Sequence, residues 1–123
     1  MNKRRPVNLN LFTIHFPVPA IISILHRISG FALFVLIPVA LWAFSCSLTD
    51  QGFDAMQQGL SNPFVKFICW VLLVPFCFHL VAGVRHLLMD VHVGSTLKGA
   101  RKTAYITFIV SAILVILAGI WLW

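Results

Sequence analysis

Three long apolar stretches constrain the fold of this chain more than any other feature of its sequence. Crossing the hydrocarbon core of a bilayer takes about 20 helical residues, and the stretches near 21–48, 64–89 and 104–123 all reach that length. Of the 123 residues, 60% are hydrophobic and only 10% are charged. The sequence therefore predicts an all-α membrane protein, in which three transmembrane helices form one bundle surrounded by membrane lipid and one domain covers residues 1–123.

The segments outside the spans are short and polar. Residues 1–20 contain Pro6, Pro17 and Pro19, and prolines at this density disfavour a continuous helix. We therefore expect a short interfacial segment that lies along the membrane before the first span. The connections at 49–62 and 90–103 contain glycines and polar residues, and we expect both to be loops.

The net charge of +6 is unevenly distributed along the chain. Lys3, Arg4 and Arg5 precede the first span and three more cations separate the second span from the third, whereas the connection after the first span carries Asp50 and Asp54. The positive-inside rule therefore places the N-terminus in the cytoplasm, or in the matrix of a mitochondrion. No nucleic-acid binding is expected, because the cations flank the spans and form no solvated patch with interleaved aromatics.

A polar stripe lies at the mouth of the first span, in the run SILHRISG at 23–30. At 100° per residue, four of its members fall within about a third of the helix circumference: Ser23, His26, Arg27 and Gly30. An arginine at mid-bilayer costs roughly 2.5–3.5 kcal/mol on insertion scales, so such a stripe is a candidate functional site. The alternatives are a packing role for Ser23 and a snorkelling anchor role for Arg27.

A second polar stripe follows the inner half of the second span, in the run HLVAGVRHLLMD at 79–90. Four residues share one face at helical spacing: His79, Gly83, His86 and Asp90. Arg85 points elsewhere, and we expect Asp90 to pair with it or with another cation. His79 lies about 16 Å from Asp90 along the helix, near the middle of the bilayer. The spacing leaves three roles open for His79, namely a hydrogen bond to another helix, a proton relay, or ligation of a metal group such as haem.

The depth of the histidines bears on how a haem could be held. Counted from the same membrane face, His26 is expected at the level of His86 or Asp90 and not at that of His79, and the third span contains no histidine. If His79 and a second histidine held one iron, the second would have to come from another polypeptide. A haem shared by His26 and His86 is the alternative within the chain, although Arg27 and Asp90 nearby favour a polar pocket at the interface.

These segments resemble the cytochrome b membrane-anchor subunit of succinate dehydrogenase, respiratory complex II. The resemblance rests on RPVNLNL at 5–11, SILHRISG at 23–30 and HLVAGVRHLLMD at 79–90, and it extends over essentially the whole chain. It is closest to the proteobacterial type, in which a second small anchor subunit, an iron–sulfur subunit and a flavoprotein subunit complete the complex. The resemblance implies a multi-pass protein of the bacterial inner membrane, with a cytoplasmic N-terminus and a periplasmic C-terminus.

The resemblance also implies roles for individual residues. His79 would be one axial ligand of a haem b shared with the second anchor subunit. Ser23 and Arg27 would line the ubiquinone site, where the hydroxyl donates a hydrogen bond to a quinone carbonyl and the guanidinium adds a fixed positive charge. His26, Arg27 and His86 would approach the haem propionates or a proton path. Succinate and flavin would bind to other subunits, because this chain contains no nucleotide-binding pattern.

Two other functions are compatible with the same residues. The chain could anchor a fumarate reductase, which works in the opposite direction. It could also be a small transporter or structural membrane subunit whose polar groups form a substrate or proton path.

The remaining conspicuous residues have structural interpretations. The cysteines show no Cys-x-x-Cys spacing, which favours packing. Tryptophans near the span ends are typical of an aromatic belt, and small residues in the third span allow close helix packing. The cysteines are Cys46, Cys69 and Cys77, the tryptophans are Trp42, Trp121 and Trp123, and the small residues are Ser111 and Gly119.

Overall fold

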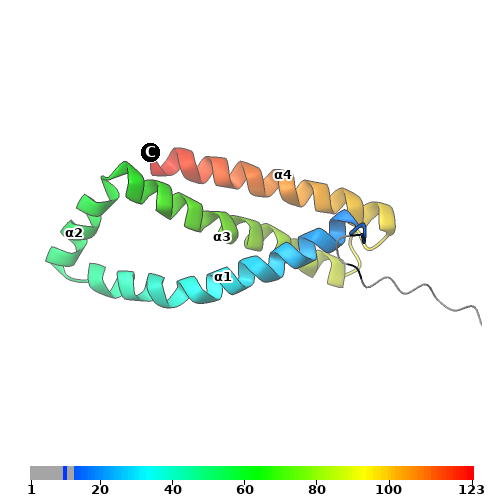
Figure 1. Ribbon diagram of the computed structural model, residues 1–123, viewed down its shortest axis with the longest axis horizontal. Helices are drawn as coiled ribbons and strands as arrows, with labels where there is room; N and C mark the ends of the chain where they lie inside the picture. The colour runs from blue at the N-terminus through cyan, green and yellow to red at the C-terminus, as the bar shows by residue number, and fades with distance from the viewer. Residues whose placement is uncertain (1–9, 11–12) are drawn as a thin grey trace, which may run out of the picture.

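The computed structural model describes residue 10 and residues 13–123, and almost all of this part of the chain is helical. Figure 1 shows three long helices side by side, with the second of them between the other two. These three are each long and apolar enough to cross a membrane, which confirms the predicted all-α membrane bundle. The helices are α1 (Val18–Ser47), α2 (Asp50–Leu60), α3 (Pro63–Asp90) and α4 (Leu97–Leu122).

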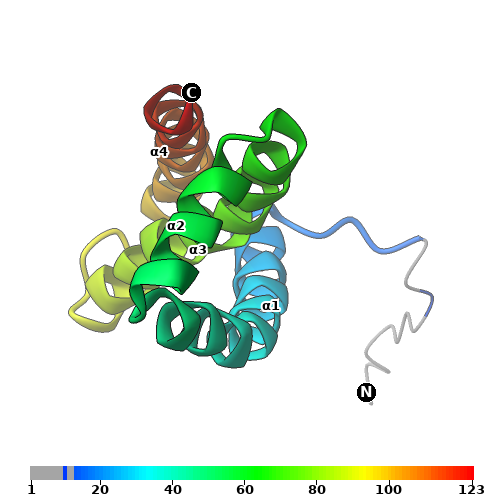
Figure 2. The same cartoon turned by 90° about the vertical axis from the view of Figure 1, so that its left-hand side faces the viewer.

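The connection at 49–62, expected to be a loop, contains the short helix α2. Thr49 caps it, because its hydroxyl oxygen accepts a hydrogen bond of 3.1 Å from the Gly52 backbone N–H. Asp50 places a carboxylate in the first turn, where it is favoured by the helix dipole. Figure 2 shows α2 lying across the end of the bundle. The loop prediction was wrong because these N-terminal signals outweigh the two glycines in the segment.

Helix α4 begins earlier than the sequence predicts, at Leu97 and not near residue 104. The Thr96 hydroxyl oxygen caps it by accepting a hydrogen bond of 3.1 Å from the Gly99 backbone N–H. The first turns of α4 carry three exposed cations, so this part of the helix extends beyond the hydrocarbon core: Lys98, Arg101 and Lys102. The loop predicted for 90–103 is therefore confined to residues 91–96.

The segment before α1 is described only in part. Residues 13–17 lie outside any helix, and α1 begins directly after Pro17. Pro19 is in the first turn of α1, where the fixed φ of proline suits a helix. The RPVNLNL run, apart from Asn10, and the three N-terminal cations lie outside the described residues. The expected interfacial segment thus stays a prediction for most of its length.

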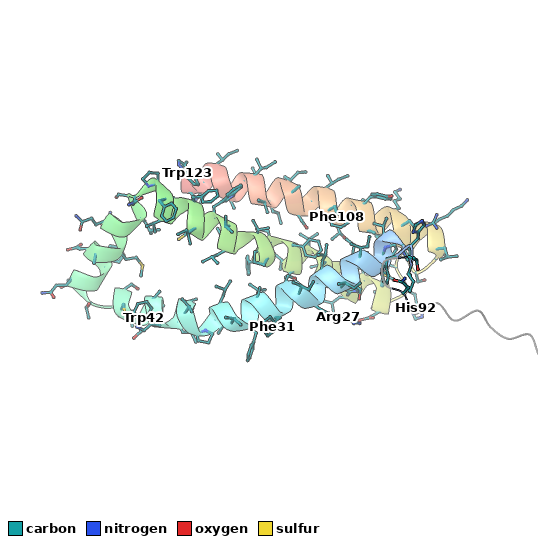
Figure 3. The ribbon with its side chains drawn as sticks, viewed as in Figure 1. Arg27, Phe31, Trp42, His92, Phe108 and Trp123 are labelled. Carbon is teal, nitrogen blue, oxygen red and sulfur yellow. The ribbon has the colours of Figure 1, made fainter. Side chains whose placement is uncertain are left out.

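The tryptophans divide into exposed and interhelical ones. Figure 3 shows Trp42 and Trp123 toward the α2 end of the bundle, and both are exposed, as an aromatic belt requires. Trp70 instead donates its indole N–H to the Val115 carbonyl at 2.8 Å and so joins α3 to α4. A Cβ built at Gly119 would lie 3.0 Å from Trp70 Nε1. Gly119 therefore allows the close packing that the sequence predicts.

Little of the apolar surface is buried inside this chain. The core consists of Ile22, Ala82 and Ala104, with three partly buried apolar side chains packed against it, those of Val18, Phe78 and Phe108. Many large apolar residues on α1, α3 and α4 are exposed, Phe31 among them, whose ring points away from the other helices in Figure 3. Because lipid tails are as apolar as these side chains, such a surface suits lipid or the helices of another subunit.

Two glycines allow α1 and α3 to approach each other closely. A Cβ built at Gly30 would lie 2.9 Å from Cε1 of His79, and one built at Gly83 would lie 3.4 Å from Nε2 of His26. Small residues are typical of such contacts between membrane helices. The two helices thus place each histidine against a glycine of its neighbour.

We expect Gly30→Ala to destabilise the protein by about 1–3 kcal/mol, because the new methyl group would overlap the His79 ring. Gly59→Ala is the matched control, since a Cβ there would meet nothing within 4 Å; it should be neutral or stabilising by about 0.5–1 kcal/mol. Thermal unfolding of the protein purified in mild detergent measures both effects. Equal stability of the two variants would contradict the close approach of α1 and α3.

Candidate functional site

Three imidazoles meet between α1 and α3. The His26 ring stacks on the His79 ring, with centroids 4.1 Å apart and an angle of 12° between the planes. The His86 ring is tilted by 56° to that of His26, with centroids 4.9 Å apart. His26 therefore contacts both histidines of α3.

This contact corrects the predicted depth of His26. The sequence placed His26 at the level of His86 or Asp90 and not of His79. The contact with His86 agrees with that level, but the His26 ring also stacks directly on that of His79. The reason is the early start of α1, which puts eight helical residues, 18–25, before His26. On α3, seven residues, 84–90, follow Gly83. His26 and Gly83 therefore lie at similar depths of about 11–12 Å from the helix ends.

The Nδ1 atom of His79 is held by α1. It lies 3.1 Å from the His26 carbonyl oxygen and 3.1 Å from Ser29 Oγ, while the Ser29 hydroxyl donates to that same carbonyl at 2.9 Å. A carbonyl oxygen can only accept, and the serine hydrogen is already engaged, so Nδ1 carries the ring proton and donates it. The neutral ring then keeps its lone pair on Nε2.

Ser29 is the site residue that sequence reasoning missed, although it belongs to the SILHRISG run. It is only 6% exposed. On a helical wheel it falls outside the stripe of Ser23, His26, Arg27 and Gly30, so the pattern gave no reason to single it out. Its role depends on the His26 backbone carbonyl, and a side-chain pattern does not include such groups.

Ser23 and Arg27 do not join the histidine cluster. Ser23 is half-buried and Arg27 is exposed, and within the described residues neither side chain forms a hydrogen bond or ion pair. Figure 3 shows Arg27 on α1 in the half of the bundle opposite α2. Both residues are therefore available to another molecule.

Arg85 lies on another face of α3 and contacts α4. Its Nε–H donates to Thr103 Oγ1 and its Nη2 donates to the Ala100 carbonyl, both at 3.2 Å. The pairing with Asp90 that the sequence suggested is not formed, since Asp90 is exposed and Arg85 has no ion pair in the part of the chain that the structure describes. Arg85 therefore lies on a different face of α3 from His79, as the helical spacing predicts.

An apolar cavity of about 630 Å³ lies between α1, α3 and α4. Few polar residues line it. One of them, Ser111, is 5% exposed, and its Oγ has no hydrogen-bond partner among the described residues. Ser23 and Arg27 are absent from its walls. The cavity can accept hydrocarbon but offers nothing to a charged group. Its walls include Leu25, Ile28, Ser29, Trp70, Phe78, Phe108 and Ser111.

The three histidines are not arranged to bind one metal ion together, although a single imidazole nitrogen can still act as a ligand. No group of three or more metal-ligating side chains occurs among the described residues. The lone pair on His79 Nε2 is suited to one axial position of a haem iron, which needs only a single side chain. His26 Nε2 is buried without a hydrogen-bond partner in the described structure, so the cluster lacks one polar contact.

Similar proteins support the predicted membrane anchor over the transporter alternative. Residues 1–118 match the succinate dehydrogenase/fumarate reductase transmembrane subunit family. The chain is 42% identical, over the full length of both proteins, to the succinate dehydrogenase cytochrome b556 subunit of Coxiella burnetii. The subunit of the same name from Rickettsia prowazekii is 30% identical, over 93% of this chain and 90% of its own length. The one from Paracoccus denitrificans is also 30% identical, over 92% of this chain and 88% of its own length.

The matches extend over the spans and over both polar stripes, so they concern the whole membrane unit and not one segment of it. The chain therefore belongs to the succinate dehydrogenase/fumarate reductase transmembrane subunit family, as a non-catalytic membrane-anchor subunit of the cytochrome b556 type.

Proposed function

We propose that this chain holds the iron–sulfur and flavoprotein subunits of succinate dehydrogenase at the membrane. In the same proposal it shares one haem b with a second small anchor subunit and forms part of the ubiquinone-reduction site. The names of its relatives support succinate dehydrogenase, and the term cytochrome b implies haem b. The observation that carries the proposal is the hydrogen bonding of His79.

We assign His79 as one axial ligand of the haem iron. The contacts of 3.1 Å from Nδ1 to the His26 carbonyl and to Ser29 Oγ favour the tautomer whose Nε2 can bind a metal. Metal-ligating histidines usually donate their other ring N–H in this way, which fixes the ring and raises its basicity. When bound, haem supplies one-electron chemistry, and the residues of this chain orient it and determine its surroundings.

We assign the second axial ligand to the other anchor subunit. Two imidazoles on opposite sides of one iron must leave room for the macrocycle between them. The centroid distances of 4.1 Å from His26 to His79 and 4.9 Å from His26 to His86 leave no such room. Helix α4 contains no histidine. These contacts argue against His26 as a second ligand beside either histidine of α3, and so support a haem shared with another subunit.

His26 and His86 are proposed to serve the haem propionates or a proton path. An unpaired buried polar atom costs about 1–3 kcal/mol, so a hydrogen-bond partner for His26 Nε2 from the cofactor or another subunit would stabilise the site. His86 lies nearer to the end of α3 and contacts His26, which in turn stacks on His79. Imidazoles can accept and release protons near neutral pH, and this series leads from the membrane face toward the proposed haem.

Ser23 and Arg27 are proposed to bind ubiquinone. They are four residues apart in α1, and therefore neighbours on one face of the helix. A serine hydroxyl can donate to a quinone carbonyl oxygen, and the guanidinium favours the negative charge that develops there during reduction. Reduction also requires protons, which His26 and His86 could deliver from the membrane face.

We place the chain in the bacterial inner membrane with its N-terminus in the cytoplasm. The exposed cations Lys98, Arg101 and Lys102 lie at the end where α4 begins, and the positive-inside rule puts this end in the cytoplasm. The C-terminus would then be periplasmic. Relatives from bacteria named as succinate dehydrogenase subunits favour succinate oxidation over the fumarate reductase alternative.

His79→Ala should remove most of the haem b from the purified complex, because alanine supplies no ligand in place of Nε2. The matched control is His15→Ala, an exposed histidine outside the helices, which should retain haem. The haem-to-flavin ratio and the reduced-minus-oxidised absorption spectrum measure the effect. Unchanged haem content and an unchanged spectrum in His79→Ala would exclude His79 as an essential ligand.

Ser29→Ala should raise the haem reduction potential, because the loss of one acceptor from the Nδ1–H makes His79 a weaker donor to oxidised iron. Ser111→Ala is the control: Ser111 is equally buried, but its hydroxyl makes no hydrogen bond among the described residues. A redox titration followed by haem absorbance compares the two variants. The same potential in both would show that Ser29 does not act through His79.

Arg27→Ala should lower ubiquinone reduction by roughly 10–100-fold, the range that corresponds to one charge-assisted hydrogen bond. Succinate oxidation with a soluble artificial electron acceptor should be retained, since succinate is proposed to bind elsewhere. Arg101→Ala, an exposed arginine on α4, controls for the loss of charge. An equal fall of both activities in Arg27→Ala would argue against a quinone role.

A further inference from the structure

One buried cation has no part in the function proposed above. Arg85 is 5% exposed, and its two hydrogen bonds, to Thr103 Oγ1 and to the Ala100 carbonyl, are both made to neutral acceptors at 3.2 Å. A guanidinium carries five N–H donors, so three remain. Within the described residues no carboxylate pairs with Arg85.

A buried charge without a counter-ion is costly, and buried arginines are therefore normally paired. The neighbouring acid on α3, Asp90, is exposed and lies outside ion-pair distance of Arg85. The other acidic residues, Asp50 and Asp54, are in α2, at the far end of the bundle. The missing negative charge must therefore come from outside this chain.

Arg85 lines a cavity of about 290 Å³ between α3 and α4. The two hydroxyls in its wall are engaged, since Thr103 Oγ1 donates to the Ala100 carbonyl at 3.2 Å and Thr107 Oγ1 donates to the Thr103 carbonyl at 2.9 Å. The other walls are apolar: Val81, Val84, Leu88, Val93 and Ile106. One cation beside hydrocarbon walls matches an amphiphile with an anionic head and apolar chains.

The depth of Arg85 agrees with such a ligand. Helix α3 has 28 residues and is therefore about 42 Å long, close to the thickness of a bilayer with its headgroups. Arg85 lies five residues before the end of α3 at Asp90, or about 8 Å inward, near the boundary between headgroups and hydrocarbon. The exposed cations Lys98, Arg101 and Lys102 at the same end would attract anionic lipids to this face.

We propose that the cavity beside Arg85 binds the phosphate of an anionic phospholipid from the leaflet that borders residues 91–96. The planar guanidinium can donate two parallel hydrogen bonds to phosphate oxygens. The acyl chains would lie along the exposed apolar side chains of Val84, Leu88 and Ile106. This site depends on neither the haem nor the quinone assignment.

The test uses the whole complex, purified in mild detergent and stripped of lipid by detergent exchange. Phosphatidylglycerol is then titrated, and bound lipids are counted by native mass spectrometry while thermal stability is followed. The wild type should bind and be stabilised, and Arg85→Gln should weaken the apparent affinity by about tenfold or more. Arg85→Lys should fall between them, because a lysine keeps the charge but lacks the planar fork. Arg101→Gln is the control for a cation that only attracts lipid to this face, so it should weaken the affinity much less than Arg85→Gln does.

Several outcomes would overturn the proposal. Equal lipid binding by the wild type and Arg85→Gln, or an equal loss in Arg101→Gln, would mean that Arg85 forms no specific site. Equal stabilisation by inorganic phosphate would identify an ion site and not a lipid site. If Arg85→Gln does not assemble, the wild type and Arg85→Lys still test the proposal. It is refuted if phosphatidylglycerol stabilises neither of these two proteins. Loss of the iron–sulfur subunit from Arg85→Gln, together with no lipid binding by the wild type, would point to a carboxylate of that subunit instead.

Discussion

The hydrogen bond from His79 Nδ1 to the His26 carbonyl is the interaction on which the candidate site depends. It determines which nitrogen of the His79 ring carries the proton, and so leaves Nε2 with its lone pair. It also requires α1 and α3 to approach closely, which Gly30 and Gly83 permit. Ser29 completes the arrangement by contacting both partners of this bond. A single polar contact thus connects the helix packing to the chemistry that the site can support.

The same type of contact recurs elsewhere in the bundle. Trp70 donates to the Val115 carbonyl and Arg85 donates to the Ala100 carbonyl, so both join α3 to α4. A polar side chain buried between membrane helices is shielded from water, and the backbone carbonyls of a neighbouring helix are the acceptors within its reach. Helix α3 is therefore held on both sides by its own polar side chains, while its apolar residues face lipid or other subunits.

The bundle separates its polar residues by the contacts that they make. Arg27 is exposed on α1, and the half-buried Ser23 makes no hydrogen bond within the described residues, whereas His26 and His79 are stacked between the helices. The proposed quinone site at Ser23 and Arg27 and the proposed haem site at His79 rest on this difference in contacts. The unpaired His26 Nε2, the counter-ion that Arg85 lacks and the exposed apolar surface all agree with a subunit that is completed by its partners and by lipid.

The sequence by itself determined the class of the protein, its three spans and the residue types at the site. Hydropathy and helical spacing are local properties, and both are readable from a single chain. They failed for α2 and for the start of α4, where Thr49 and Thr96 cap helices in segments that look like loops. Only the tertiary structure decided that His26 stacks on His79, that Ser29 holds His79, and that Arg85 turns to α4. These facts depend on the offset between neighbouring helices and on backbone carbonyls, and neither leaves a pattern in the side chains of the sequence.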